Sequence, residues 1–69
     1  MPIVLAPLNK TLTIVKIATD DKTKKRLESL GVTVNGEITL LNSAKSVVVK
    51  VKDGKIALDS DLSSKIFVK

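Results

Sequence analysis

The chain has 69 residues, which is one domain at most and close to the smallest size that a single hydrophobic core can hold together. It contains no cysteine and no histidine, which excludes disulfides, thiolate metal sites and imidazole bases; 43% hydrophobic and 1% aromatic residues leave aliphatic packing as the source of stability. The net charge of +5 suits nucleic acid, an anionic membrane surface or an acidic protein, but scattered lysines most often only keep a protein soluble.

The N-terminal residues have no basic segment, and Pro7 interrupts their apolar run, so neither a signal peptide nor a membrane span is predicted. We therefore expect a soluble protein with one domain, residues 1–69. Pro7 and Asn9 predict a turn, and a strand then runs to residue 17 in alternating threonines and aliphatic residues. The alternation slips at Val15, which predicts a bulge or a strong bend there.

A single short helix is predicted to follow. Asp20 or Asp21 is the candidate N-cap, because either carboxylate can accept hydrogen bonds from the first helical turn. Gly31 comes directly after the last periodic leucine, where helices commonly end in a left-handed residue. In such an ending Val32 would pack against Leu27, three residues before the C-cap. A helix this short must pack on a sheet to be stable.

The remainder of the chain predicts short strands joined by turns. The Asn-Gly pair places a turn at residues 33–36, and residues 37–41 form a strand with Ile38 and Leu40 on one side. A row of three valines then predicts a strand with one buried face, with lysines between them on the other face: Val47, Val49 and Val51.

Asp53-Gly54 between two alternating segments predicts a two-residue hairpin turn, which would place Val51 and Ile56 on the same inward face. Residues 59–64 predict a single turn or a short 3₁₀ segment, and residues 66–68 a final strand.

Five short strands at even spacing favour a small closed barrel, because closure removes exposed sheet edges. The predicted fold is mainly β: a small SH3-like barrel of about five strands with one short α-helix between the first two strands. An OB-type barrel is the alternative.

The residue types of this chain argue against catalysis and against cofactor or metal binding. Serines and threonines have no neighbouring base, and the isolated glycines form no phosphate-binding loop, so we predict no catalytic residue, no cofactor and no enzyme activity. The only local carboxylate clusters are Asp20-Asp21 and the pair Asp59 and Asp61, which we interpret as cap and turn residues and not as metal ligands. Phe67 is the only aromatic residue, so a stacking platform for single-stranded nucleic acid is missing.

The basic residues of the predicted helix are the remaining candidate site. Lys24, Lys25 and Arg26 form the only run of positive charge, with Lys22 close by. Such a helix surface is most often just solvated, and its functional interpretation is a docking surface for an acidic partner.

Several strings, in order over essentially the whole chain, resemble the FeoA family. The most specific is Lys-Arg-Leu-Glu-Ser-Leu-Gly at the end of the predicted helix, and the others are Ala6–Leu8, Glu37–Leu40, Val49–Val51, Ile56–Leu58 and Ile66–Val68. Where relatives usually carry glycine this chain has Asn9 and Asn35, and asparagine is the non-glycine residue that best tolerates positive φ.

The resemblance implies a cytoplasmic SH3-like module that accompanies the membrane ferrous-iron permease and acts by binding its cytosolic GTPase part. The family is also associated with transition-metal binding, and the same domain occurs at the C-terminal end of iron-dependent repressors. Two alternatives remain open from the residues: a small basic barrel that binds nucleic acid, although stable nucleic acid binding is not expected, and a metal-sensing domain.

Overall fold

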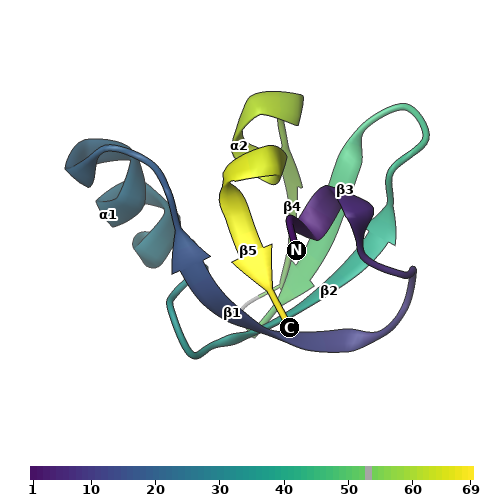
Figure 1. The fold of residues 1–69 in the computed structure, drawn as a ribbon. Helices are drawn as coiled ribbons and strands as arrows, with labels where there is room; N and C mark the ends of the chain where they lie inside the picture. Colours follow the sequence, from purple (N-terminus) through teal and green to yellow (C-terminus); the bar gives the residue numbers. More distant parts are fainter. Residues whose placement is uncertain (53) are drawn as a thin grey trace.

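The computed structural model describes residues 1–52 and 54–69. Along the chain the elements are η1 (Ile3–Leu5), β1 (Thr11–Ile17), α1 (Asp21–Ser29), β2 (Glu37–Asn42), β3 (Val47–Val51), β4 (Gly54–Leu58), α2 (Ser60–Lys65) and β5 (Ile66–Val68) (Figure 1). The strands pair antiparallel in the order β4-β3-β2-β1-β5. The predicted fold is confirmed: a small, mainly β, SH3-like domain with an α-helix between the first two strands.

Strand β1 is bent and pairs with two different neighbours. Its first part, residues 11–13, lies opposite β2, and its second part lies opposite β5. The register shifts between Ile14 and Lys16, so Val15 is the extra residue of a bulge. The bulge predicted at Val15 is therefore confirmed, and it bends β1 so that the sheet wraps around one core.

The core is aliphatic throughout and draws on nearly every element. The hydrophobic residues whose side chains are almost completely enclosed, with at most 2% of their surface exposed, are Ile3, Ile14, Leu27, Val32, Ile38, Leu40, Val49, Ile66 and Val68; Ser63 is a buried polar residue beside them. Alternation along the strands produces this core: Ile38 and Leu40 point inward from β2, and the three predicted valines point inward from β3. Both inward sets were predicted and are confirmed.

The end of α1 is a Schellman motif. The N–H of Gly31 donates to the carbonyl oxygen of Glu28 at 3.0 Å, and the N–H of Val32 donates to that of Leu27 at 2.9 Å. Gly31 has φ of 97°, a left-handed conformation that costs glycine little. Val32 and Leu27 are both buried in the same hydrophobic cluster, and the predicted helix end is confirmed.

Two asparagines hold tight turns in the left-handed region, as predicted. Asn9 has φ of 62° and Asn35 has φ of 72°. The turn at residues 33–36 is closed by the N–H of Gly36, which donates to the carbonyl oxygen of Thr33 at 3.0 Å. A Cβ on Gly36 would lie 2.8 Å from the Thr33 Oγ1, so this turn also needs glycine at its last position.

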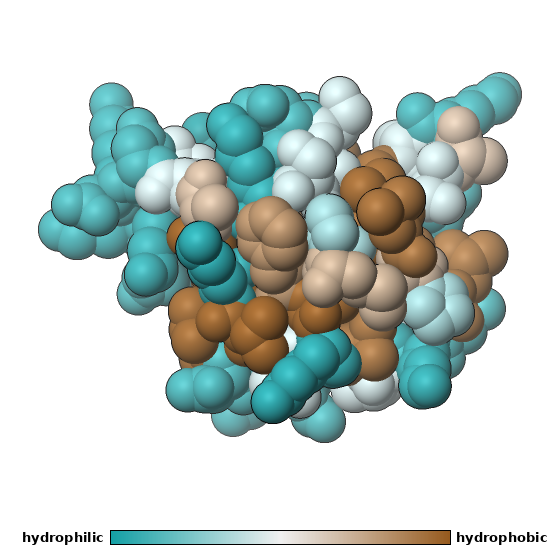
Figure 2. Space-filling model, viewed as in Figure 1, coloured by the Kyte–Doolittle hydropathy of each residue, from teal (hydrophilic) through white to brown (hydrophobic). Residues whose placement is uncertain are grey.

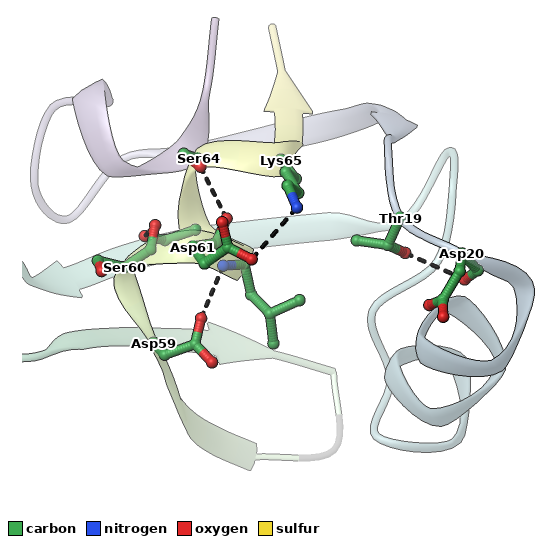
Figure 3. A network of polar contacts seen from close by, with 9 residues as sticks. Thr19, Asp20, Asp59, Ser60, Asp61, Ser64 and Lys65 are labelled. Carbon is green, nitrogen blue, oxygen red and sulfur yellow. Dashed lines mark hydrogen bonds and ion pairs between the residues drawn. The ribbon is translucent and has the colours of Figure 1, made fainter.

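The prediction of a single turn at residues 59–64 was wrong, because residues 60–65 form the second helix, α2 (Figure 3). Asp59 is its N-cap and accepts a hydrogen bond from the N–H of Leu62 at 2.7 Å. Lys65 pairs with Asp61 one turn earlier at 3.2 Å, and buried Ser63 donates to the carbonyl oxygen of Ser60 at 3.0 Å. Local polar contacts therefore complete a helix in a segment that has no apolar periodicity.

The hairpin between β3 and β4 differs from its prediction in register. Asp53, the first predicted turn residue, lies outside the described residues, but Gly54 belongs to β4 and pairs with Val51. Ile56 consequently lies opposite Val49 and not opposite Val51. A shift of two residues keeps every side chain on its face, so Val51 and Ile56 do share one face, as predicted.

Within the described residues, no pairing between β4 and β5 closes the sheet, which differs from the expected closed barrel. Helix α2 instead connects these two strands directly. The outer edge of β5 is occupied by the N-terminal residues: the N–H of Val68 donates to the carbonyl oxygen of Met1 at 2.7 Å, and Pro2 bridges to Phe67. Because Pro2 has no N–H, it suits a position at the sheet edge.

Substitution of Gly31 tests the helix end. Gly31→Val should lower the free energy of unfolding by about 1–2 kcal/mol, because a β-branched residue is strained at positive φ. Gly31→Asn should cost clearly less, since asparagine already holds positive φ at two other positions. Thermal melts of the three proteins provide the measurement, and equal melting temperatures would contradict this account of the helix end.

Substitutions at the last residue of β3 and at the residue that follows it test the inward face. Val51 is buried and Lys52 is exposed, so Val51→Lys should destabilise by more than about 2 kcal/mol because it buries an unpaired charge, whereas Lys52→Val should have little effect. Urea unfolding of both variants measures the difference. Similar midpoints for the two variants would show that the face of β3 is assigned wrongly.

Candidate docking surface

Helix α1 begins at an aspartate cap. The N–H of Thr23 donates to the Asp20 Oδ1 at 3.1 Å, which resolves the choice between the two candidate aspartates in favour of Asp20. Hydrogen bonds from the Thr23 side chain, and then from its backbone, lower the pKa of the Asp20 carboxyl. Asp21 lies in the first turn, where the helix dipole favours a negative charge.

Only a narrow side of α1 is packed against the rest of the molecule. Leu27 is its one buried residue, and the Val32 that follows the helix packs beside it. The opposite side is exposed to solvent, as Figure 1 shows for the helix at the left edge of the fold. Its charged residues are therefore available to a partner.

The three predicted docking residues do not share one side of this helix. Successive residues of an α-helix are about 100° apart, so Lys24 and Arg26 point in directions that differ by about 200°. Lys25 and Arg26 are exposed, whereas Lys24 is half-buried. Lys24 and Lys25 line a shallow hollow of about 310 Å³ together with two carboxylates, Asp21 and Glu28.

Helix geometry groups a different set of cations. Lys22 lies four residues before Arg26 and three before Lys25, so these three exposed side chains are neighbours on the helix surface. We call Lys22, Lys25 and Arg26 the cationic face of α1. The run of adjacent charges in the sequence and the three- and four-residue spacing both lie on α1, but only the spacing groups side chains that are neighbours on the helix surface.

A second hollow of about 790 Å³ lies on the outer side of the sheet, between the end of α1 and strand β3. The hydroxyl oxygens of Thr11 and Thr39, which pair across β1 and β2, are 3.1 Å apart on this side. The charged residues that line the hollow are Glu28, Glu37, Lys50 and Lys52. They include no thiol and no imidazole, so no nucleophile–base pair of the usual kinds is formed.

The aspartates considered as metal ligands have structural roles. Asp20 and Asp59 cap α1 and α2, and Asp61 pairs with Lys65 (Figure 3). Over residues 1–52 and 54–69, no three acidic, histidine or cysteine residues come together in a way that could hold a metal ion.

Fold and surface together define a class: a small, mainly β, SH3-like domain whose surface carries charged groups, shallow hollows and some exposed apolar side chains. The FeoA domain matches residues 1–69, the whole of the chain. The chain therefore belongs to the FeoA domain family, which is associated with ferrous iron transport.

Solved structures with the same fold are similar to this chain at low sequence identity. A crystal structure of an iron uptake regulatory protein (FeoA) is 20% identical with a TM-score of 0.87, and the alignment covers all of this chain and 93% of that one. Iron(II) transport protein A from Clostridium thermocellum is 18% identical with a TM-score of 0.88, over 100% and 44% of the two chains. A manganese-dependent transcriptional repressor is 17% identical with a TM-score of 0.85, over 99% and 40%.

A search of curated proteins found no match. In the part of the chain that the structure describes, neither α1 nor α2 is long and apolar enough to cross a membrane.

The Asp20 cap should make stability depend on pH. Since the pKa of Asp20 is lower in the folded protein than in the unfolded chain, its contribution is complete above the unfolded value near 3.8 and is lost as pH falls through the lower, folded value. Asp20→Asn keeps a capping oxygen but does not titrate. Melting temperatures should therefore fall more steeply for the native chain than for this variant as pH decreases from 5 to about 2; parallel curves would contradict the role of Asp20.

Proposed function

We propose that residues 1–69 act as one non-enzymatic accessory module of ferrous iron uptake, located in the cytoplasm and working by protein–protein interaction. The partner in this proposal is the cytosolic GTPase part of a ferrous-iron membrane permease. The observation that carries it is the match of the whole chain to the FeoA domain. The iron uptake and iron(II) transport proteins with the same fold support the same process.

The chemistry of the chain supports binding over catalysis. Without histidine or cysteine, the usual general bases, thiol nucleophiles and soft metal ligands are missing from the sequence. The Asp20, Asp59 and Asp61 carboxylates already cap helices or form an ion pair. A module with these properties acts through the shape and charge of its surface.

The cationic face of α1 is the proposed docking surface for the permease. Its three side chains are exposed and adjacent, and α1 as a whole carries four cations against two carboxylates. Individual exposed ion pairs contribute little to affinity, so the face acts as a unit that attracts an acidic surface and orients the encounter. Lys24 contributes less, because its side chain is half-buried whereas those of the cationic face are exposed.

Metal-dependent regulation is a second candidate function, because a manganese-dependent transcriptional repressor has the same fold. A metal-sensing domain would require a donor set, and the sequence offers only oxygen ligands for a transition metal. Titration with ferrous or manganous ions separates this candidate from the first, because only the sensor should bind them tightly.

Charge reversal tests the docking surface. The variant Lys22→Glu/Lys25→Glu/Arg26→Glu should associate with the isolated GTPase part about tenfold more slowly than the native chain, with a smaller salt dependence. The matched control Lys10→Glu/Lys45→Glu/Lys55→Glu makes the same change in net charge at exposed positions outside α1. Association rates over a salt series provide the measurement, after thermal melts confirm that both variants fold.

Equal slowing by both triple variants would show that net charge, and not the cationic face, drives the encounter. Absence of any binding by the native chain would refute the proposed partner.

A further inference from the structure

One face of the molecule combines exposed apolar side chains with lysines. In Figure 2 hydrophobic residues gather over η1 and over the region where β1 crosses β5, with hydrophilic side chains between and around them. The N-terminal segment and β1 contribute exposed apolar residues: Leu5 of η1 is 71% exposed, Met1 is 50% exposed and Val15 of β1 is 41% exposed. A 69-residue chain that must bury aliphatic side chains to fold leaves these outside its core.

The sheet brings a further apolar row to this face. Ile66 and Val68 are buried, so Phe67 between them points to the outer side of β5. Pro2 lies opposite Phe67 on one side and Lys16 on the other. The β1 bulge leaves Val15 exposed next to Lys16. We call Met1, Pro2, Leu5, Val15 and Phe67 the front patch.

Two lysines border this patch. Lys16 pairs with Phe67 across β1 and β5, and Lys69 lies two residues beyond Phe67, on the same side of the extended chain. Thr13 and Lys69 exchange backbone hydrogen bonds of 3.0 Å, which hold Lys69 beside β1. Among the described residues the one ion pair is Lys65–Asp61, so neither bordering lysine is held by a carboxylate there.

We propose that the front patch binds an anionic phospholipid surface. Lysines beside exposed leucine, valine and phenylalanine match the two parts of a membrane interface, since phosphate groups attract the ammonium groups and the acyl boundary accepts the apolar side chains. The net charge of +5 strengthens the attraction.

The shape of the surface favours lipid over a peptide partner. Peptide anchors are usually bound in well-formed pockets, but neither of the two hollows described above borders the front patch. A lipid surface is deformable and needs only protruding side chains, of which Leu5 is the most exposed. Binding through this face would leave α1 free, because η1 and α1 lie on different sides of the fold (Figure 1).

Sedimentation with lipid vesicles tests the proposal. The native chain should bind vesicles of phosphatidylcholine that contain phosphatidylglycerol, should not bind pure phosphatidylcholine, and should be released by salt. Lys16→Glu/Lys69→Glu should weaken binding more than tenfold, since each lysine near an anionic surface contributes about fivefold. Leu5→Ser should weaken it about fivefold by removing the most exposed apolar anchor.

The controls match each change elsewhere on the surface. Lys45→Glu/Lys55→Glu reverses two exposed lysines, and Leu30→Ser removes an exposed leucine from the end of α1. Both variants should bind vesicles with an affinity within about twofold of that of the native chain, because the change in net charge alone has a small effect. The variant with a reversed cationic face on α1 should bind vesicles more tightly than Lys16→Glu/Lys69→Glu, although it loses more positive charge; this separates the proposal from the docking on the permease.

Three results would overturn the proposal. The first is no binding of the native chain to the anionic vesicles. The second is equal weakening by the control variants, which would mean unspecific charge attraction. The third is binding of a synthetic peptide of alternating leucine and glutamate, lost in the front-patch variants, without binding to vesicles; this would assign the face to an acidic protein segment.

Discussion

The bend in β1 is the constraint on which the rest of the structure depends. Its first residues pair with β2 and its last with β5, so the bulge at Val15 determines how far the sheet curls. Directly before the bulge, the backbone of Ile14 accepts a hydrogen bond from Asn35 at 2.7 Å and donates one to the carbonyl oxygen of Gly36 at 2.9 Å. The turn that follows α1 is thereby attached to the bend. The position of the helix, and of its cationic face, follows from these two bonds.

Features with a local cause were predictable from the sequence. The helix end depends on Gly31 and on residues within four positions of it, and the left-handed turns at Asn9 and Asn35 depend on residues within the turns themselves. The inward valines of β3 follow from alternation alone. The five short strands favoured an SH3-like barrel with an OB-type barrel as the alternative, and the family resemblance implied the SH3-like fold.

Features that depend on contacts between distant segments of the chain were not predictable in the same way. The six residues of α2 carry cap signals that a turn would share, and packing against the N-terminal segment adds to the local polar contacts that favour a helix. The register of β4 depends on which residue faces Val51, and the favourable Asp-Gly pair suggested an alignment shifted by two. In the candidate site, adjacency of charges in the sequence was a poor guide, because a helix sends neighbours such as Lys24 and Arg26 to different sides.

The order in which the chain is synthesised has a consequence for how this fold is completed. Strands β2, β3 and β4 are joined by short connections and can pair as soon as they leave the ribosome. The core on their inner face is completed only when β5 is added. Ile14 of β1 pairs with Val68 of β5, and Val68 is hydrogen-bonded to Met1, 67 positions earlier in the chain. Until residue 68 has emerged, the inward valines of β3 lack the β5 residues of the same core cluster. The nascent chain then exposes aliphatic side chains of its sheet to solvent. Closure therefore cannot come before β5 has been made, and its speed decides how long the unfinished domain is vulnerable to aggregation or to proteases.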